Sequence, residues 1–439
     1  MSRARCQSAP LYRRLPPGPS ALTRGEVERN QRTRIYGAMI EAVACHGYEV
    51  TTVADVIALA GVSRRAFYEL FANKQDCFLA THDIVLAQAR KRMVEAWRDG
   101  SGFSDRLHAS CSTLFDRSAA EPNGARLALV EIGAVGLPAR VRMHLATASF
   151  EQLVVGAFRA APQEARMPPL AARALVGGAR HLMAERLRCG RAHELRGLGS
   201  ELLDWALAYG TPMASRLGEL HVPVRAATPG GGPVPGLLLS TDERVRALEG
   251  LTLLALEHDG TGFSDADVAR RAGMTTEAFR RQFTSRDACW LALLGDFADQ
   301  GAAAARAARA GASSWPEAVV RALDGFLAHA RDHLELVRIA FVHVFGAGAA
   351  VAAQVTRSVE GLVAELTTGA PRPRYGAPIL RPALAGALWT ILAGCATGAR
   401  LARLAGAVHQ LAYVVLAPYL GARAAVEALQ GARVAARAR

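Results

Sequence analysis

The stretch AGVSRRAFYELFANK at residues 60–74 returns as AGMTTEAFRRQFTSR at residues 272–286. The two align without a gap at an offset of 212 residues, and the same offset pairs Asp55 with Asp267 and Cys77 with Cys289. Self-similarity at a fixed offset is the sequence signature of repeated structural units, and here it predicts two copies of one unit of about 190 residues.

Helical spacing is common along the chain and strand signals are scarce. Apolar residues at i, i+3, i+4, i+7 and i+8 mark one helix face in the stretch before the first copy, at Ile35, Ala38, Met39, Ala42 and Val43. We therefore expect an all-α protein.

The first copy reads as two short helices around a tight turn. Thr52 is suited to cap a helix over residues 53–60, and Ser63 to cap a second over residues 64–71. Gly61 between them permits a positive φ and so a sharp turn. Phe67 and Phe71, four residues apart, share the face that is buried. This arrangement predicts a helix-turn-helix.

The opposite face of the second helix carries Arg64, Arg65 and Tyr68. Arginine suits the acceptors of guanine in the major groove, and Tyr68 and Lys74 are placed for phosphates. Two surface arginines alone would equally fit a plain helical hairpin. The complete ordered set of caps, glycine and aromatic residues favours the DNA-binding interpretation.

The segment TTVADVIALAGVSRRAFYELFANKQDCF, with the preceding TRIYGAMIEAVACHGY, closely resembles the DNA-binding region of TetR-family transcriptional regulators. The resemblance implies a ligand-responsive regulator, expected to be a repressor, that binds a double-stranded DNA operator. It also implies a helical effector-binding and dimerisation region after each helix-turn-helix. Carried over residue by residue, the DNA contacts expected from it are Thr52, Ser63, Arg64, Arg65, Ala66, Tyr68 and Lys74.

The second copy keeps its scaffold but departs on the outer face. Glu277 stands where the first copy has Arg65, and acidic residues precede the motif. A carboxylate would repel phosphate, although it could accept a hydrogen bond from cytosine. A degenerate copy and one that reads a different half-site both stay open. The DNA contacts expected in the second case are Thr275, Thr276, Arg280, Arg281 and Arg286.

The repeat and a Pro/Gly-rich stretch at residues 222–236 set the domain boundaries. We expect a flexible basic arm (1–28), a helix-turn-helix domain (29–80), a ligand-binding and dimerisation bundle (81–221), a linker (222–240), a second, diverged helix-turn-helix domain (241–293), a second bundle (294–430) and a basic tail (431–439). Because such regulators work as two-fold dimers, the tandem predicts a pseudo-dimer within one chain. A homodimer of the whole chain stays open.

A mostly apolar pocket between bundle helices is the expected site for a small apolar effector. Its candidate lining residues are Trp97, Phe115, Met143, Phe150, Met183, Phe326, Phe341 and Trp389. Each of these fits a packed core equally well. His329 and His333 have the spacing of a metal pair on a helix, but a lone pair is more often structural, and we predict no metal and no cofactor.

Charge and cysteine content add limits. The formal net charge is +13, which favours a polyanionic partner, although much of the excess lies at the chain ends. Seven cysteines without CxxC pairs indicate reduced thiols, and no signal peptide or long apolar span is seen, so we expect a cytoplasmic protein without a membrane segment. No catalytic constellation is visible, so an enzyme is not expected. The alternative is a helical small-molecule sensor or partner-binding protein with structural helix-turn-helix regions.

Overall fold

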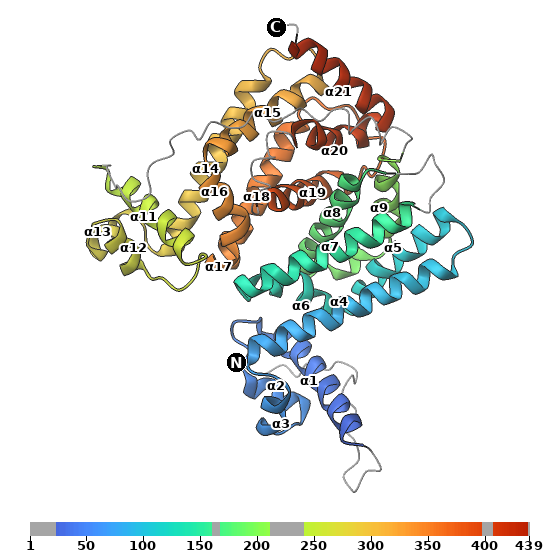
Figure 1. The fold of residues 1–439 in the computed structure, drawn as a ribbon, viewed down its shortest axis with the longest axis vertical. Coiled ribbons are helices and arrows are strands. Elements are labelled where there is room, and N and C mark those ends of the chain that lie inside the picture. Colours follow the sequence, from blue (N-terminus) through green and yellow to red (C-terminus); the bar gives the residue numbers. More distant parts are fainter. Residues whose placement is uncertain (1–22, 160–166, 211–240, 397–406, 438–439) are drawn as a thin grey trace.

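The computed structural model describes residues 23–159, 167–210, 241–396 and 407–437, and every regular element within these ranges is a helix. The all-α prediction is therefore confirmed for this part of the chain. Figure 1 shows α2 and α3 at the lower end of the molecule, α12 and α13 at its left, and α8 and α19 between them. The predicted linker at 222–240 and residues 1–22 of the predicted arm lie outside the described residues.

The N-terminal half (residues 23–210) is built from α1 (Arg24–His46), α2 (Val53–Ala60), α3 (Arg64–Leu70), α4 (Lys74–Asp99), α5 (Phe103–Ala120), α6 (Pro122–Leu129), η1 (Glu131–Ala134), α7 (Leu137–Arg159), α8 (Pro169–Arg188), η3 (Ala192–Leu195) and α9 (Leu198–Leu207).

The C-terminal half (residues 241–437) is built from α11 (Glu243–Glu257), α12 (Asp265–Arg271), α13 (Thr276–Gln282), α14 (Arg286–Arg309), α15 (Trp315–Asp332), α16 (Leu334–Arg338), η4 (Ile339–His343), α17 (Val344–Ala347), α18 (Ala349–Leu366), α19 (Leu380–Cys395), α20 (Val408–Leu420) and α21 (Ala422–Arg437).

The helix bounds follow the offset of the sequence repeat. Both bounds of α13 lie 212 residues after those of α3, and both bounds of α15 lie 212 residues after those of α5. The start of α14 keeps the same offset from the start of α4.

Both predicted terminal segments were drawn too long. The helix α1 begins at Arg24 rather than after residue 28, because Thr23 and Glu26 form a capping box in which the Glu26 carboxylate accepts from the Thr23 N–H at 2.7 Å. At the other end α21 extends to Arg437, so the segment predicted as a basic tail from residue 431 is helical up to that residue.

Two separate hydrophobic cores hold these helices. The smaller core joins α1, α2, α3 and the start of α4 through buried residues such as Ile35, Met39, Phe67 and Phe78, and extends to Leu127 and Ile132. The larger core runs from α5, α8 and α9 through the whole C-terminal half and includes Phe279 beneath α13. The second helix-turn-helix therefore shares its core with the bundle, whereas the first has its own.

The two halves meet where α8 packs along α19, and glycines make this approach close. A Cβ atom on Gly177 would lie 2.4 Å from Thr390 Oγ1, and one on Gly386 would lie 2.3 Å from His181 Cβ. Real Cβ contacts are never that short, so only glycine fits at either position without movement of the neighbouring helix. The junction also carries hydrogen bonds, including Gly376 N–H to Asp204 Oδ2 at 2.6 Å.

Candidate nucleic-acid interface and ligand cavity

The first helix-turn-helix is fixed by local contacts that the sequence specifies. Thr52 accepts from the Asp55 N–H and Ser63 accepts from the Ala66 N–H, so each short helix has a capped N-terminus. Gly61 ends α2 in the left-handed region with φ 60°. Phe67 and Phe71 are buried beneath α3. The orientation of α3 is therefore determined by caps, one glycine and its packing.

The outer face of α3 presents cationic and aromatic side chains to solvent. Arg64 and Arg65 are exposed, and Tyr68 is 50% exposed. Arg65 pairs with Glu69 at 2.8 Å on the same helix, an exposed contact that contributes little free energy. Within the described residues, no ion pair or hydrogen bond holds the Arg64 guanidinium. Its donors are free to reach a ligand, and Ala66 beside it is half-buried.

Lys74 has a local role that the sequence did not indicate. Its ammonium donates to the carbonyl oxygens of Tyr48 at 2.9 Å and Glu49 at 3.2 Å, and lies 4.3 Å from the centroid of the Tyr48 ring. Burial lowers the pKa of Lys74. These contacts tie the start of α4 to the segment between α1 and α2. A phosphate contact by Lys74 would have to share the ammonium with these carbonyl groups.

The second helix-turn-helix has the same caps but a different outer face. Ser264 and Thr275 cap α12 and α13 as Thr52 and Ser63 cap their counterparts, and Thr276 is the first residue of α13. The arginines of this copy have partners. Arg280 lies 3.9 Å from Asp265, Arg281 lies 3.9 Å from Glu277, and Arg286 donates to the Phe263 carbonyl at 3.0 Å.

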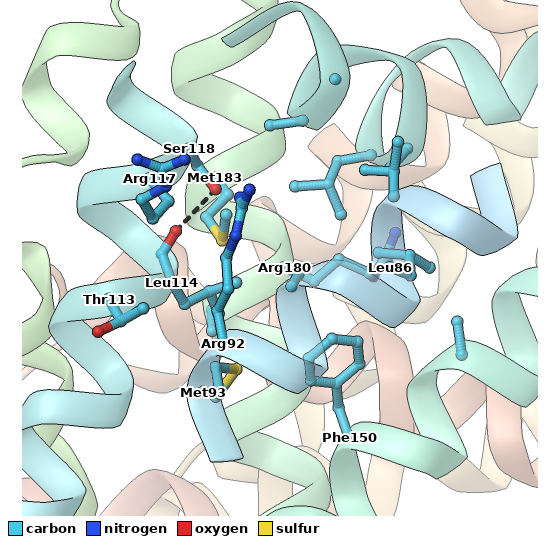
Figure 2. Close-up of a pocket in the computed structure, with 18 of the residues that line it drawn as sticks. Leu86, Arg92, Met93, Thr113, Leu114, Arg117, Ser118, Phe150, Arg180 and Met183 are labelled. Carbon is cyan, nitrogen blue, oxygen red and sulfur yellow. Dashed lines mark hydrogen bonds between the residues drawn. The ribbon is translucent and has the colours of Figure 1, made fainter. Parts of the chain in front are cut away.

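A cavity of about 720 Å³ lies in the N-terminal half among α4, α5, α6, α7 and α8. Figure 2 shows Leu86, Met93, Phe150 and Met183 among the side chains that line it. Of the predicted pocket residues, Met143, Phe150 and Met183 line the cavity. Trp97 and Phe115 do not; Phe115 is fully buried and Trp97 packs on Phe103.

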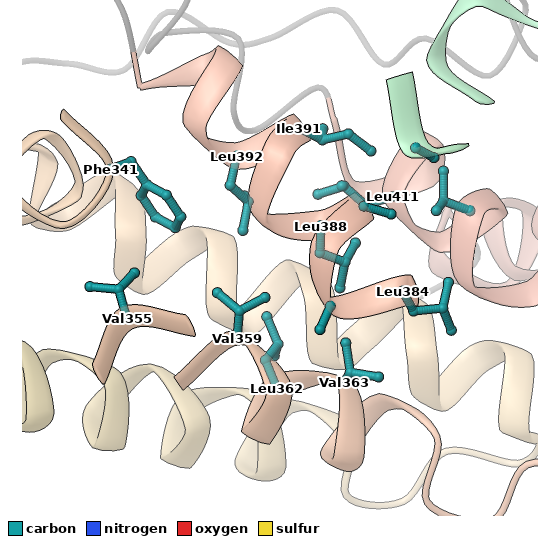
Figure 3. Packing of buried hydrophobic residues seen from close by; sticks show 14 of the residues in the cluster. Phe341, Val355, Val359, Leu362, Val363, Leu384, Leu388, Ile391, Leu392 and Leu411 are labelled. Carbon is teal, nitrogen blue, oxygen red and sulfur yellow. The ribbon is translucent and has the colours of Figure 1, made fainter. Parts of the chain in front are cut away.

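The equivalent region of the C-terminal half is filled. Figure 3 shows Phe341, Val355, Val359, Leu362 and Leu388 packed between α18 and α19. The cavity left there has a volume of only about 40 Å³. The predicted residues Phe326 and Phe341 line it, and Trp389 does not. The two halves therefore differ in the space they offer to a ligand.

Sequence reasoning missed the charged part of the large cavity. Its lining holds three arginines and two glutamates, which are Arg92, Arg117, Arg180, Glu41 and Glu121. The signal that could have found Arg180 is its position inside the otherwise apolar and small-residue stretch ALVGGARHLM of α8.

Two further searches bear on the class of site. Across the described ranges, no three His, Cys, Asp or Glu side chains come together as metal ligands would; the rings of His329 and His333 lie 4.7 Å apart, with no third candidate. None of the helices within those ranges combines the length and the hydropathy that a membrane span requires.

The comparisons with known proteins agree with this geometry at the N-terminal end. The profile described as "Bacterial regulatory proteins, tetR family" matches residues 35–81. No curated protein matches the chain significantly.

Several solved structures are similar to part of the chain. The fatty acid degradation regulator FadR from Bacillus halodurans is 16% identical, with a TM-score of 0.37 over 40% of this chain and 94% of that chain. The transcriptional regulator FadR from Bacillus subtilis, solved in complex with stearoyl-CoA, is 20% identical, with a TM-score of 0.37 over 39% of this chain and 96% of that chain. A TetR-like transcriptional regulator from Rhodococcus sp. RHA1 is 15% identical, with a TM-score of 0.35 over 43% of this chain and 98% of that chain.

The profile match covers α2, α3 and the ends of the helices that flank them, which are the elements held together by the smaller core. Residues 35–81 are therefore identified as a domain of the tetR family of bacterial regulatory proteins, built around a helix-turn-helix.

Proposed function

We propose that the chain is a cytoplasmic transcriptional regulator that binds a double-stranded DNA operator through α3. The observation that carries this proposal is the face of α3, where Arg64, Arg65 and Tyr68 are exposed on a helix fixed at its N-terminus by Ser63. In the major groove the two arginines read guanine acceptors, each good bidentate pair giving about 1–3 kcal/mol of discrimination. Tyr68 donates to a phosphate and sets the register. Thr52, Ser63, Ala66 and Lys74 complete the proposed contact set.

We also propose that the two halves are tandem copies that act as an intramolecular pseudo-dimer. The equal helix bounds at the offset of 212 support this, because they repeat the order of elements and not only a motif. The close packing of α8 on α19 supports it further, since it joins equivalent helices of the two copies. The two helix-turn-helix units would then read two half-sites of one operator. A homodimer of the chain is the competing arrangement.

Whether α13 reads DNA remains open between two versions of this proposal. In the first, α13 is a retained scaffold, because Glu277 is exposed and Asp265 lies near Arg280. In the second, Thr275, Thr276, Arg280, Arg281 and Arg286 read a different half-site. The weak ion pairs at 3.9 Å leave both arginines of α13 available to phosphate.

The proposed response to a ligand uses the cavity of the N-terminal half. The helix α8 lines that cavity and also packs against α19, so a ligand there acts on the junction between the halves. A ligand that binds one arrangement of the halves more tightly shifts the population toward it. We propose that the ligand-bound arrangement no longer fits the operator, which makes the chain a repressor.

Selection of bound fragments from the host's genomic DNA tests these proposals. The native chain is compared with Arg64→Ala/Tyr68→Ala and with Arg280→Ala/Arg281→Ala, two matched pairs of exposed side chains. Loss of the selected site in both variants supports two reading helices in one asymmetric operator. Loss only in the first variant supports a scaffold role for α13, and particle size then decides between monomer and homodimer. If the native chain enriches no sequence over a salt series, the sensor or partner-binding alternative replaces the regulator.

A further inference from the structure

The charges of the large cavity do not balance. Arg92 and Arg117 both pair with Glu121, Arg92 at 3.2 Å. Glu41 accepts from the Asn123 side chain at 3.3 Å. Burial lowers the pKa of His82, which favours its neutral form. Three arginines against two glutamates therefore leave one positive charge in the lining.

Arg180 is the arginine without a carboxylate. Across the described ranges its guanidinium has no ion-pair partner, and its recorded contact is with the ring of Trp389, whose centroid lies 4.9 Å away. Burial, with Arg188 nearby, lowers the pKa of Arg180 to about 10, so the group stays protonated at neutral pH. A cation–π contact contributes about 0.5–2 kcal/mol, which is less than the several kcal/mol that burial of a charge costs.

The rest of the lining is apolar and large enough for an organic molecule. Ligand sites typically have about 300–1,000 Å³, and this cavity has about 720 Å³. Leu86, Met93, Phe150 and Met183 form much of its wall (Figure 2). An apolar compound would occupy this space but would leave the charge of Arg180 uncompensated.

We propose that the cavity binds an amphipathic organic anion, with its apolar body along Phe150 and Met183 and its single carboxylate or phosphate head on Arg180. This inference rests on the proposed function in taking the cavity as the effector site, and it replaces the apolar effector expected from the sequence with a charged one. An anionic head gives Arg180 the charge-assisted hydrogen bonds that it lacks.

The same contact joins the ligand to the junction between the halves. Arg180 belongs to α8 and Trp389 to α19, so the guanidinium lies between the cavity and the opposite half. When Arg180 turns to an anionic head, its contact with the Trp389 ring weakens. The ligand thereby changes a contact across the junction as well as filling the cavity.

Binding of three matched series to the full chain tests the proposal. The probes are straight-chain fatty acids from octanoate to hexadecanoate, the corresponding alcohols, and the corresponding alkyl phosphates, measured by calorimetry and by tryptophan fluorescence. The variants are Arg180→Gln, Arg180→Lys and, as a matched control in the same lining, Arg92→Gln. Comparison with Trp389→Phe assigns the fluorescence change to Trp389.

We expect one anion per chain, with acids or phosphates bound about tenfold or more tighter than the alcohol of equal length. Arg180→Gln should remove this preference by weakening the anion alone, whereas Arg180→Lys and Arg92→Gln should retain it. Whether acids or phosphates bind better identifies the head group. The proposal is overturned if alcohols bind as tightly as anions, if no anion binds, or if Arg180→Gln weakens both series equally, as a purely structural role would.

Failure of the proposed function gives a different pattern. A chain that shows the Arg180-dependent anion preference but enriches no genomic DNA keeps the inference and loses the regulator. A chain that enriches an operator but shows no preference for anions keeps the regulator and loses the inference.

Discussion

The hydroxyl of Tyr209 donates a hydrogen bond of 2.8 Å to the carbonyl oxygen of Val414, 205 residues further along the chain. Pro418 lies inside α20 and has no N–H, so the Val414 carbonyl four residues earlier loses its helical partner. The tyrosine of one half thus fills the acceptor left open by a proline of the other. The same hydroxyl accepts from the Trp205 indole N–H at 3.0 Å.

Tyr209→Phe should destabilise the chain by about 1–3 kcal/mol, because it leaves a buried carbonyl and a buried indole N–H without partners. The measurement is the free energy of unfolding in urea. In the Tyr209→Phe background, Pro418→Ala should recover part of the loss, since alanine offers an N–H to Val414. Strict additivity of the two changes would argue against this account.

Gly177→Ala should destabilise by about 1–3 kcal/mol through overpacking at the junction. The added Cβ would lie 2.4 Å from Thr390 Oγ1 and 2.7 Å from the Gly386 carbonyl oxygen, so one helix must move. Thermal unfolding measures the change.

Gly156→Ala on α7 is the matched control for the junction. An added Cβ at Gly156 meets no atom within 4 Å, so this substitution should be neutral or stabilise by about 0.5–1 kcal/mol. Equal melting temperatures for the two variants would show that the glycines of α8 do not set the approach of the helices.

Glu277→Arg should strengthen DNA binding if α13 lies on DNA. Glu277 has a side chain that is 88% exposed, and the change replaces a negative by a positive charge on the outer face of α13. The slope of log affinity against log salt should steepen by about 1 for each new phosphate contact. Glu427→Arg on α21 makes the same charge change away from both helix-turn-helix units, and an equal effect there would indicate net charge alone.

Stability should fall as the pH drops below about 6.5, in part through His343. Burial lowers the pKa of His343 from its ordinary 6.5, and Arg338 and Arg140 act in the same direction against the opposite effect of Asp259. The unfolded chain then binds a proton at a higher pH than the folded chain does, so unfolding becomes easier as the pH falls through this range.

Melting temperatures at about pH 7.5 and about pH 5.5 check this expectation. His343→Leu should reduce the difference between them, whereas His144→Gln, at an exposed position, should leave it unchanged. His82 and His329 also have pKa values lowered chiefly by burial, so a residual dependence is expected. An undiminished difference in the His343 variant would contradict the assignment.

Cysteine reactivity should divide into two classes. Cys45 and Cys189 are exposed, whereas burial raises the pKa of Cys77, Cys111 and Cys289 to about 12. Since the thiolate reacts, the buried group should be slower by about a thousandfold or more toward an aromatic disulfide reagent near pH 8. Cys45→Ser/Cys189→Ser should remove most of the fast phase, and urea should make the rest reactive. Rapid labelling of Cys289 in the folded chain would contradict the burial.

The sequence predicted the helix-turn-helix well because its determinants are local. Thr52, Gly61 and Ser63 act on the backbone within a few residues, and Phe67 and Phe71 need only helical spacing to share a face. The start of α1 was missed although its capping box is equally local, since Thr23 follows a proline-rich stretch that was taken to extend to residue 28.

The cavity could not be predicted in the same way. Phe115 and Phe150 look alike in the sequence, yet one is fully buried and the other borders open space. Which of them lines a cavity depends on how helices far apart in the chain pack together. The pairing of Arg180 with Trp389 likewise depends on the junction between the halves, which no local pattern specifies.

The crossing of α8 and α19 also bears on how this chain can vary by mutation. In a dimer of identical subunits every substitution at the axis occurs twice, so a harmful contact is doubled and a compensating change must suit both sides. Here Gly177 faces Thr390, and Gly386 faces His181. Each side of the crossing is encoded separately, so one helix can change while its partner is held constant. The two reading heads can therefore diverge in sequence preference without dissolving the junction that holds them together.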